Sequence, residues 1–185
     1  TIKDISEKTQ EELEDRLGKW GIDLWHKSQG IHHGEVSSYH EAKSISSEHT
    51  FDENKLDIAF LKSELVRLTE KIAYELRQDG KVAGCVAVKI RYHDFETTSR
   101  QTTVPYTCAD DEIIPVVKEL FDKLYKKGEP VRLLGVRLSE LTNDAIQTNL
   151  FDDVERKTDL YKAIDNVKNR FGKNLINRAS SSKNK

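Results

Sequence analysis

Lys89, Arg91 and His93 stand at alternate positions in the second half of the segment VAGCVAVKIRYHDF, residues 82–95. Because successive side chains of a β-strand point to opposite faces, Lys89, Arg91 and His93 share one face. The other face is apolar and consists of Val86, Val88, Ile90 and Tyr92. If helices cover the apolar face, the cations lie on an open sheet surface beside the Ser and Thr hydroxyls of neighbouring strands. Cations and small hydroxyl donors with little aromatic surface favour contacts to phosphate over stacking on bases.

The distribution of charge along the chain favours this interpretation, although the total charge does not. The 185 residues have a formal net charge of −2, which by itself argues against a polyanionic partner. However, residues 80–109 contain four basic and two acidic residues, and residues 131–138 contain two basic residues and no acid. The alternative is an ordinary solvated sheet face that is charged for solubility, and composition alone favours this alternative.

Other reactive residue types do not form a catalytic or metal-binding pattern. The acidic cluster at 110–112 (DDE) precedes a predicted helix, where carboxylates stabilise the positive end of the helix dipole. We therefore interpret the cluster as a capping turn. The adjacent histidines 32–33 lie on an extended segment and point apart, so we expect no metal site. Cys85 and Cys108 have no partner at ligand spacing, and we predict that both are small buried hydrophobic residues in a reducing cytoplasm.

A pair of large apolar residues, Leu150 and Phe151, stands in the polar run AIQTNLFDD, after the last predicted strand. Such a pair either packs on the edge of the core or contacts a partner. The pattern alone favours the core edge.

The elements that position these residues follow from periodicity. From residue 43 the chain reads as strand, helix, strand, strand, helix, strand, with strands predicted at 43–51, 82–95, 100–107 and 131–141. The most economical fold is α+β: a four-stranded, mainly antiparallel sheet with two helices on one face (βαββαβ), a ferredoxin-like arrangement.

Both helices are indicated by apolar residues at spacings of three and four. The first has a stripe from Ile58 to Leu76, is predicted to be capped by Asp52 and ends near Gly80. The second has a stripe from Ile113 to Leu124, ends near Gly128 and is predicted to have Asp111 as its cap and Pro115 in its first turn.

The remaining segments flank this unit. Residues 1–30 are expected to form two short helices separated by Gly18 and Gly21, and 31–42 an extended linker. A third helix is predicted at about 153–171, with an apolar stripe of Leu160, Ile164, Val167 and Phe171, followed by a disordered basic tail. The chain begins at Thr1 inside a helical region, which suggests a piece of a longer protein. No run approaches the roughly 20 apolar residues that a membrane span needs.

These segments resemble a known family. KSISSEHTF, VAVKIRYHDFETTSRQTTV and RLLGVRLSEL are similar to the little-finger domain of Y-family DNA polymerases, of the bacterial DinB (DNA polymerase IV) group or its UmuC-type relatives. TIKDISEKTQEELEDRLGKWGIDLW resembles the end of the family's thumb. The resemblance implies a thumb segment at 1–30, a linker at 31–42, a little finger at 43–142, a second linker at 143–152, and a C-terminal helix and tail at 153–185.

The resemblance implies an error-prone, translesion DNA polymerase whose little finger lies along primer–template duplex DNA and holds its phosphates. By position, the implied DNA contacts are Lys43, Ser44, Ser46, Lys89, Arg91, Thr98, Ser99, Arg100, Gln101, Thr103, Arg132 and Arg137. The family's catalytic carboxylates and their Mg²⁺ ions belong to the palm, which this chain lacks. We therefore expect no catalytic residue, no cofactor and no polymerase activity in this chain, and we expect it to be a cytoplasmic monomer without membrane contact.

With the family in view, the pair at 150–151 is better explained as a partner contact. Gln147, Leu150 and Phe151 resemble the short motif that bacterial polymerases insert into the sliding clamp, although Thr148 replaces the usual aliphatic residue. Leu and Phe would anchor in an apolar groove, and the Gln amide would satisfy a buried polar site.

Two other functions stay open. A ferredoxin-like regulatory domain would bind a metabolite or oligomerise through its sheet, and would need a pocket or an apolar patch on the open face. Alternatively, the domain mainly recruits proteins and its DNA contacts are incidental.

Overall fold

The computed structural model of the chain describes residues 1–32, 34–35, 41–143, 154–173 and 175–181, with the side chains of 154–158 outside the description. The chain divides into two compact units, Thr1–Glu41 and Ala42–Lys185. Within the described residues, no helix has the length and apolar character that crossing a membrane requires.

The first unit contains three helices, α1 (Ile2–Ser6), α2 (Gln10–Leu17) and α3 (Lys19–Ser28), so the prediction of two was wrong. Gly18 alone separates α2 from α3, and its φ of 61° suits a residue without a side chain. Gly21 lies inside α3, where a Cβ would come within 2.0 Å of the Leu13 carbonyl oxygen. Gly21 therefore permits close packing of α3 on α2 and does not break the helix.

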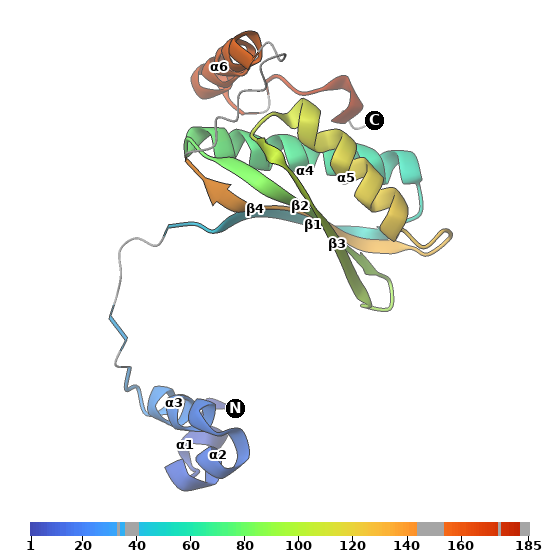
Figure 1. Cartoon of the computed structure of the whole chain (residues 1–185). Coiled ribbons are helices and arrows are strands. Elements are labelled where there is room, and N and C mark those ends of the chain that lie inside the picture. The colour runs from blue at the N-terminus through green and yellow to red at the C-terminus, as the bar shows by residue number, and fades with distance from the viewer. Residues whose placement is uncertain (33, 36–40, 144–153, 174, 182–185) are drawn as a thin grey trace. The chain divides into compact units, whose positions relative to one another are not determined.

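The second unit is built on an antiparallel sheet of β1 (Ser44–Lys55), β2 (Val82–Tyr92), β3 (Thr97–Thr107) and β4 (Val131–Thr142), in the order β1-β4-β2-β3. Helices α4 (Ile58–Gln78) and α5 (Asp110–Leu124) cover one face of this sheet (Figure 1). The predicted fold class, an α+β unit with a four-stranded antiparallel sheet and two helices on one face, is confirmed.

The core lies between the sheet and these two helices. The apolar positions of β2, from Val86 to Tyr92, are at most 2% exposed, and Leu61, Leu65 and Leu68 of α4 are at most 1% exposed. Each such side chain stabilises the fold by about 1.5–3 kcal/mol when it is buried. These contacts therefore determine which face of the sheet the helices cover.

Two predicted caps and one proline position were wrong. Strand β1 continues four residues past Phe51, so Asp52 lies in the strand and Asp57 caps α4 by accepting bonds from Ala59 N (2.8 Å) and Phe60 N (3.2 Å). Helix α5 has Ala109 as its N-cap, and Asp111 is already helical. Pro115 consequently lies in the second turn of α5.

Helix α6 (Val154–Phe171) packs on the layer formed by α4 and α5. The face that it buries is not centred on the apolar residues of its sequence pattern. Tyr161, Asp165 and Lys168 are each 7% exposed, whereas Leu160 and Phe171 are 57% and 61% exposed. The ends of the predicted apolar stripe are thus exposed, its middle residues Ile164 and Val167 are half-buried, and the most buried positions of the helix are Tyr161, Asp165 and Lys168.

The chain after α6 does not fit the predicted disordered tail within residues 175–181. These residues include the 3₁₀ helix η1 (Ala179–Ser181), and Arg178 N donates to Glu70 Oε1 of α4 at 3.0 Å. The tail segment is thus held by hydrogen bonds to α4.

The central contact of this region is Arg77 of α4. Its guanidinium donates to Asp110 of α5 (2.7 Å), to Asp165 of α6 (2.8 Å) and to the Cys108 carbonyl (2.9 Å), and lies 4.5 Å from the Tyr161 ring centroid. The side chains of Arg77, Asp110 and Asp165 are 8%, 8% and 9% exposed. Burial opposes the charge, but the two carboxylates outweigh it and raise the pKa of Arg77.

Replacing Arg77 with Met is expected to lower the free energy of unfolding by about 3–5 kcal/mol. The buried Asp165 would lose its cation, and the buried Asp110 would keep only Arg178 at 3.5 Å. Urea unfolding at neutral pH measures this loss. Lys62→Met is the matched control, since its pair with Asp122 also joins α4 to α5 but is 32% and 56% exposed. Such exposed pairs contribute about 1 kcal/mol or less. Equal losses in the two variants would contradict the central role of Arg77.

A second buried charge lies between β1 and α4. Glu64 is 2% exposed, and its carboxylate meets His49 Nδ1 at 2.5 Å and Arg67 Nε at 2.9 Å. Burial opposes ionisation, but the hydrogen bonds and charges of Arg67 and His49 outweigh it and hold the pKa of Glu64 below its usual 4.5.

Because the folded-state pKa of Glu64 is lowered, its ionised form stabilises the fold above the ordinary pKa, and this stabilisation is lost as the pH falls through the folded-state value. We expect Glu64→Gln to lower the free energy of unfolding by about 1–3 kcal/mol at pH 7. The difference from the unmodified chain should shrink as the pH falls below about 4.5. Urea unfolding across this pH range measures it, and a difference independent of pH would refute the assignment.

Candidate nucleic-acid interface

Most of the predicted contact residues lie on the face of the sheet opposite the helices. Strand register aligns Ser46 of β1 with Arg137 of β4, then Ala87 of β2 and Gln101 of β3. Since side chains across neighbouring strands at paired positions share a face, the odd-numbered positions of β2 from Cys85 to Arg91 and their partners form one surface. Ala83, beyond the register shift, lies in the core. The predicted residues on this surface are Ser44, Ser46, Lys89, Arg91, Ser99, Gln101, Thr103 and Arg137.

Two predicted residues, Thr98 and Arg100, lie on the other face. They pair with Ile90 and Val88 of β2, whose side chains are in the core. The Thr98 hydroxyl is buried and, among the described atoms, has no hydrogen-bond partner. The structure therefore does not place these two side chains with the cations of the open face.

Two further predicted residues lie at the ends of strands. Lys43 precedes β1. Arg132 falls between two pairs, Arg91↔Leu133 and Tyr92↔Val131, and is the extra residue of a β-bulge. Its guanidinium lies 4.8 Å from the Phe95 ring centroid, at the turn between β2 and β3. Arg132 thus belongs to the end of the sheet near this turn.

An ion pair crosses the open face. Lys89 Nζ of β2 lies 2.5 Å from Glu48 Oε1 of β1, although β4 lies between these strands. The crossing depends on Gly135 of β4, where a Cβ would lie 2.9 Å from Glu48 Cγ. The pair was not predicted from the sequence. The signal was the shared parity of Glu48 and Lys89 together with a glycine in the intervening strand.

The cations of the face are therefore not equivalent. Lys89 is compensated by Glu48, and both side chains are about 40% exposed (40% and 39%). Arg91 Nε donates to Thr97 Oγ1 at 2.8 Å. Arg137 is exposed, and no carboxylate of the described residues pairs with it. Arg137 is the cation most available to an anionic partner.

Register adds three hydroxyl residues that the sequence did not single out, namely Thr50, Thr97 and Ser139. Together with Ser46, Ser99 and Thr103 they surround the cations with small donors. Such donors, with guanidinium groups, suit phosphate and sugar contacts, which fix position without reading base sequence.

The acidic cluster at 110–112 does not fit a magnesium site. Asp110 pairs with Arg77, Asp111 accepts from the Tyr161 hydroxyl, and Glu112 accepts from the Thr107 hydroxyl. Across the described residues, no group of three or more His, Cys, Asp or Glu side chains could hold a metal ion. The two cysteines are free thiols, with Cys85 buried and Cys108 half-buried.

Comparison with known proteins gives one family and many relatives. Residues 42–150 match the C-terminal domain of the impB/mucB/samB family. The chain is 35% identical over 153 residues to the DNA polymerase IV of Methanoculleus marisnigri, covering 83% of this chain and 42% of that protein. It is 38% identical over 140 residues to the DNA polymerase IV of Streptococcus pneumoniae serotype 4, covering 75% and 40%.

A third relative, the DNA polymerase IV of Desulfatibacillum aliphaticivorans, is 33% identical over 186 residues, covering 97% of this chain and 47% of that protein. The chain thus spans less than half the length of these curated relatives.

Proposed function

Because the chain belongs to the impB/mucB/samB family, with residues 42–150 as its C-terminal domain, we propose that it is the DNA-gripping region of a Y-family DNA polymerase. The parent protein would be a DNA-directed DNA polymerase, a nucleotidyltransferase of translesion synthesis and DNA repair. The observation that carries the proposal is the open sheet face, where Lys89, Arg91 and Arg137 stand among hydroxyl and amide donors.

The chemistry of nucleotide transfer would lie outside this chain. Mg²⁺, when bound in a palm, would activate the attacking hydroxyl and stabilise the departing pyrophosphate. The described carboxylates of this chain do not fit that ion, so the chain's own task is to bind and orient the duplex. We expect the purified chain to be monomeric and to extend no primer. In the cell, we expect the protein to act in the cytoplasm.

Phosphate contacts from a rigid sheet suit such a task. They hold the duplex at a fixed distance and register, yet they accept any base sequence, including a damaged one. The Lys89–Glu48 pair is half exposed, so a phosphate can compete for Lys89 at small cost.

The salt dependence of duplex binding tests the sheet face. Arg137→Ala, and Lys89→Ala combined with Arg91→Ala, should weaken binding to primer–template DNA. Each lost phosphate contact should flatten the slope of log affinity against log salt by about 0.7–0.9. Glu48→Gln should act in the opposite direction and strengthen binding roughly threefold to tenfold at low salt, because it removes the acid that competes for Lys89. Fluorescence anisotropy with a labelled duplex measures all three.

Lys123→Ala is the matched control for these substitutions. It removes one positive charge from α5, where Lys123 is paired with Glu119 and 52% exposed. This variant should leave the salt slope unchanged. If the sheet variants and the control behaved alike, or if the slope were flat in the unmodified chain, the sheet face would not be the DNA contact.

We also propose that Gln147, Leu150 and Phe151 tether the chain to the sliding clamp. These residues lie outside the described part of the structure, and the proposal depends on their sequence alone. The segment stands between β4, which ends at Thr142, and α6, which begins at Val154. A linker between two folded elements can present an extended peptide to an apolar groove.

Replacing Leu150 and Phe151 with Ala should weaken clamp binding by at least about tenfold, because paired apolar anchors supply most of the energy of such peptide contacts. Surface plasmon resonance with immobilised clamp measures the affinity. Thr148→Leu restores an aliphatic side chain and should strengthen binding, while duplex affinity stays the same in both variants. Unchanged clamp affinity after loss of both anchors would exclude the motif.

A further inference from the structure

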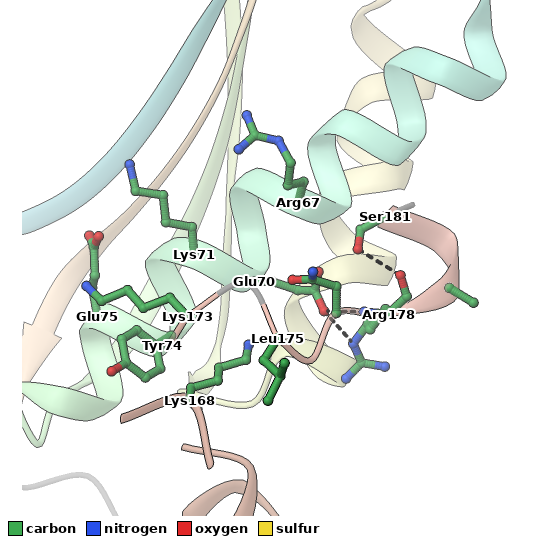
Figure 2. Close-up of a pocket in the computed structure, with 12 residues that line it drawn as sticks. Arg67, Glu70, Lys71, Tyr74, Glu75, Lys168, Lys173, Leu175, Arg178 and Ser181 are labelled. Atoms are coloured by element: carbon green, nitrogen blue, oxygen red, sulfur yellow. Dashed lines mark hydrogen bonds and ion pairs between the residues drawn. The ribbon is translucent and has the colours of Figure 1, made fainter. Parts of the chain in front are cut away.

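A cleft of about 800 Å³ opens on the helical side of the second unit, between α4 and the segment that follows α6 (Figure 2). This site is separate from the open sheet face and independent of its proposed function. Five cationic and two acidic side chains line the cleft. This excess of positive charge contrasts with the net charge of −2 of the whole chain. The cleft therefore suits an anionic ligand.

Lys168 of α6 is the most buried of the cations that line the cleft. The residue is only 7% exposed, and its ammonium lies 5.9 Å from the Tyr74 ring centroid. Among the described residues, no carboxylate forms an ion pair with Lys168. A buried cation is costly unless it is paired, so an anion in the cleft would offset this cost.

The floor of the cleft also holds two polar atoms that have no hydrogen-bond partner among the described residues. They are Glu70 Oε2, an acceptor, and Arg178 Nε, a donor. Glu70 is 6% exposed, and its other oxygen accepts from Arg178 N at 3.0 Å. Arg178 Nε lies 3.8 Å from Glu70 Oε1, which is too long for a hydrogen bond. Figure 2 shows Glu70, Arg178 and Lys168 directed toward the same space. The ligand must therefore offer a donor and an acceptor beside its anionic group.

The type of cation distinguishes phosphate from carboxylate. The guanidinium of Arg67 is already occupied by both oxygens of Glu64, at 2.9 and 2.5 Å, so it cannot form a second fork to a carboxylate. The guanidinium of Arg178 is partly occupied by Asp110, at 3.5 Å. The other cations of the cleft wall are Lys71, Lys168 and Lys173, which act as compact point charges. Ammonium groups suit the several oxygens of a phosphate, and a carboxylate beside them suits the hydroxyls of a sugar.

We propose that this cleft binds a sugar phosphate of the nucleotide class. The phosphate lies against Lys168, and the exposed Lys173 adds positive charge to the cleft wall. After a shift of the covering side chains, a sugar hydroxyl donates to Glu70 Oε2 and accepts from Arg178 Nε. The volume of the cleft is within the range of about 300–1,000 Å³ that is usual for sites of small ligands. The same chemistry is offered by a free nucleotide and by the end of a nucleic-acid strand.

Isothermal titration calorimetry on the full 185-residue chain tests the site with AMP, inorganic pyrophosphate, a 5′-phosphorylated single-stranded oligonucleotide and a glutamate-rich peptide. Lys168→Ala and Lys173→Ala should each weaken AMP binding by about tenfold. Lys173 is exposed, so its substitution carries the test even if Lys168→Ala unfolds the helix. Lys162→Ala on α6 lies outside the cleft and is the matched control, with no change expected.

Glu70→Gln separates a sugar phosphate from a bare anion. It should weaken AMP binding, because the carboxylate acceptor is lost, but leave pyrophosphate binding equal or tighter, because a negative charge is removed. An oligonucleotide that binds at least about tenfold tighter than AMP identifies a strand end as the ligand, and the reverse order identifies a free nucleotide. The proposal is overturned if no phosphate probe binds below about 10 mM, if only the peptide binds, or if the cleft variants match the control.

Discussion

The two-residue period of β2 is the constraint on which both surfaces of the second unit depend. Val86, Val88, Ile90 and Tyr92 are buried against α4 and α5, so the intervening side chains must face the other way. A shift of the β2 register by one residue would move Lys89 and other charged groups into the core. The free energy of burying these unpaired charges would unfold the domain. The packing that stabilises the domain is therefore also what holds its cations on the open face, and the rigidity of that face follows from the core.

The open face is only moderately basic because one acid crosses it. Glu48 reaches Lys89 over Gly135, so one of three cations is compensated while Arg91 and Arg137 are not paired with a described carboxylate. A half-exposed pair contributes little to stability, and its lysine can exchange a carboxylate for a phosphate. In the function proposed above, such a surface would release the duplex and bind it again at the next register.

The sequence predicted the features that depend on local periodicity and missed those that depend on contacts between distant elements. The strands, the two core helices and the parity of Lys89 and Arg91 follow from spacing alone. The cap of α4 could not be placed, because Asp52 and Asp57 are equally good caps until β1 is known to continue past Phe51. Arg132 was grouped with Arg137 because a bulge, which changes the side-chain alternation, leaves no mark in the sequence.

Helix α6 shows most clearly why periodicity was insufficient. Its apolar stripe resembles a packing face, yet Leu160 and Phe171 are exposed and the buried face carries Tyr161, Asp165 and Lys168. Arg77 favours a different face of α6, because its buried guanidinium needs carboxylates as partners and α6 supplies one of them, Asp165. Charge pairing, together with burial of the Tyr161 ring and partial burial of Ile164 and Val167, thus sets the rotation of α6, and the same rotation brings Lys168 to the wall of the cleft. Arg77 of α4 therefore contributes both to the ion pair that holds α6 and to the position of the cleft beside it.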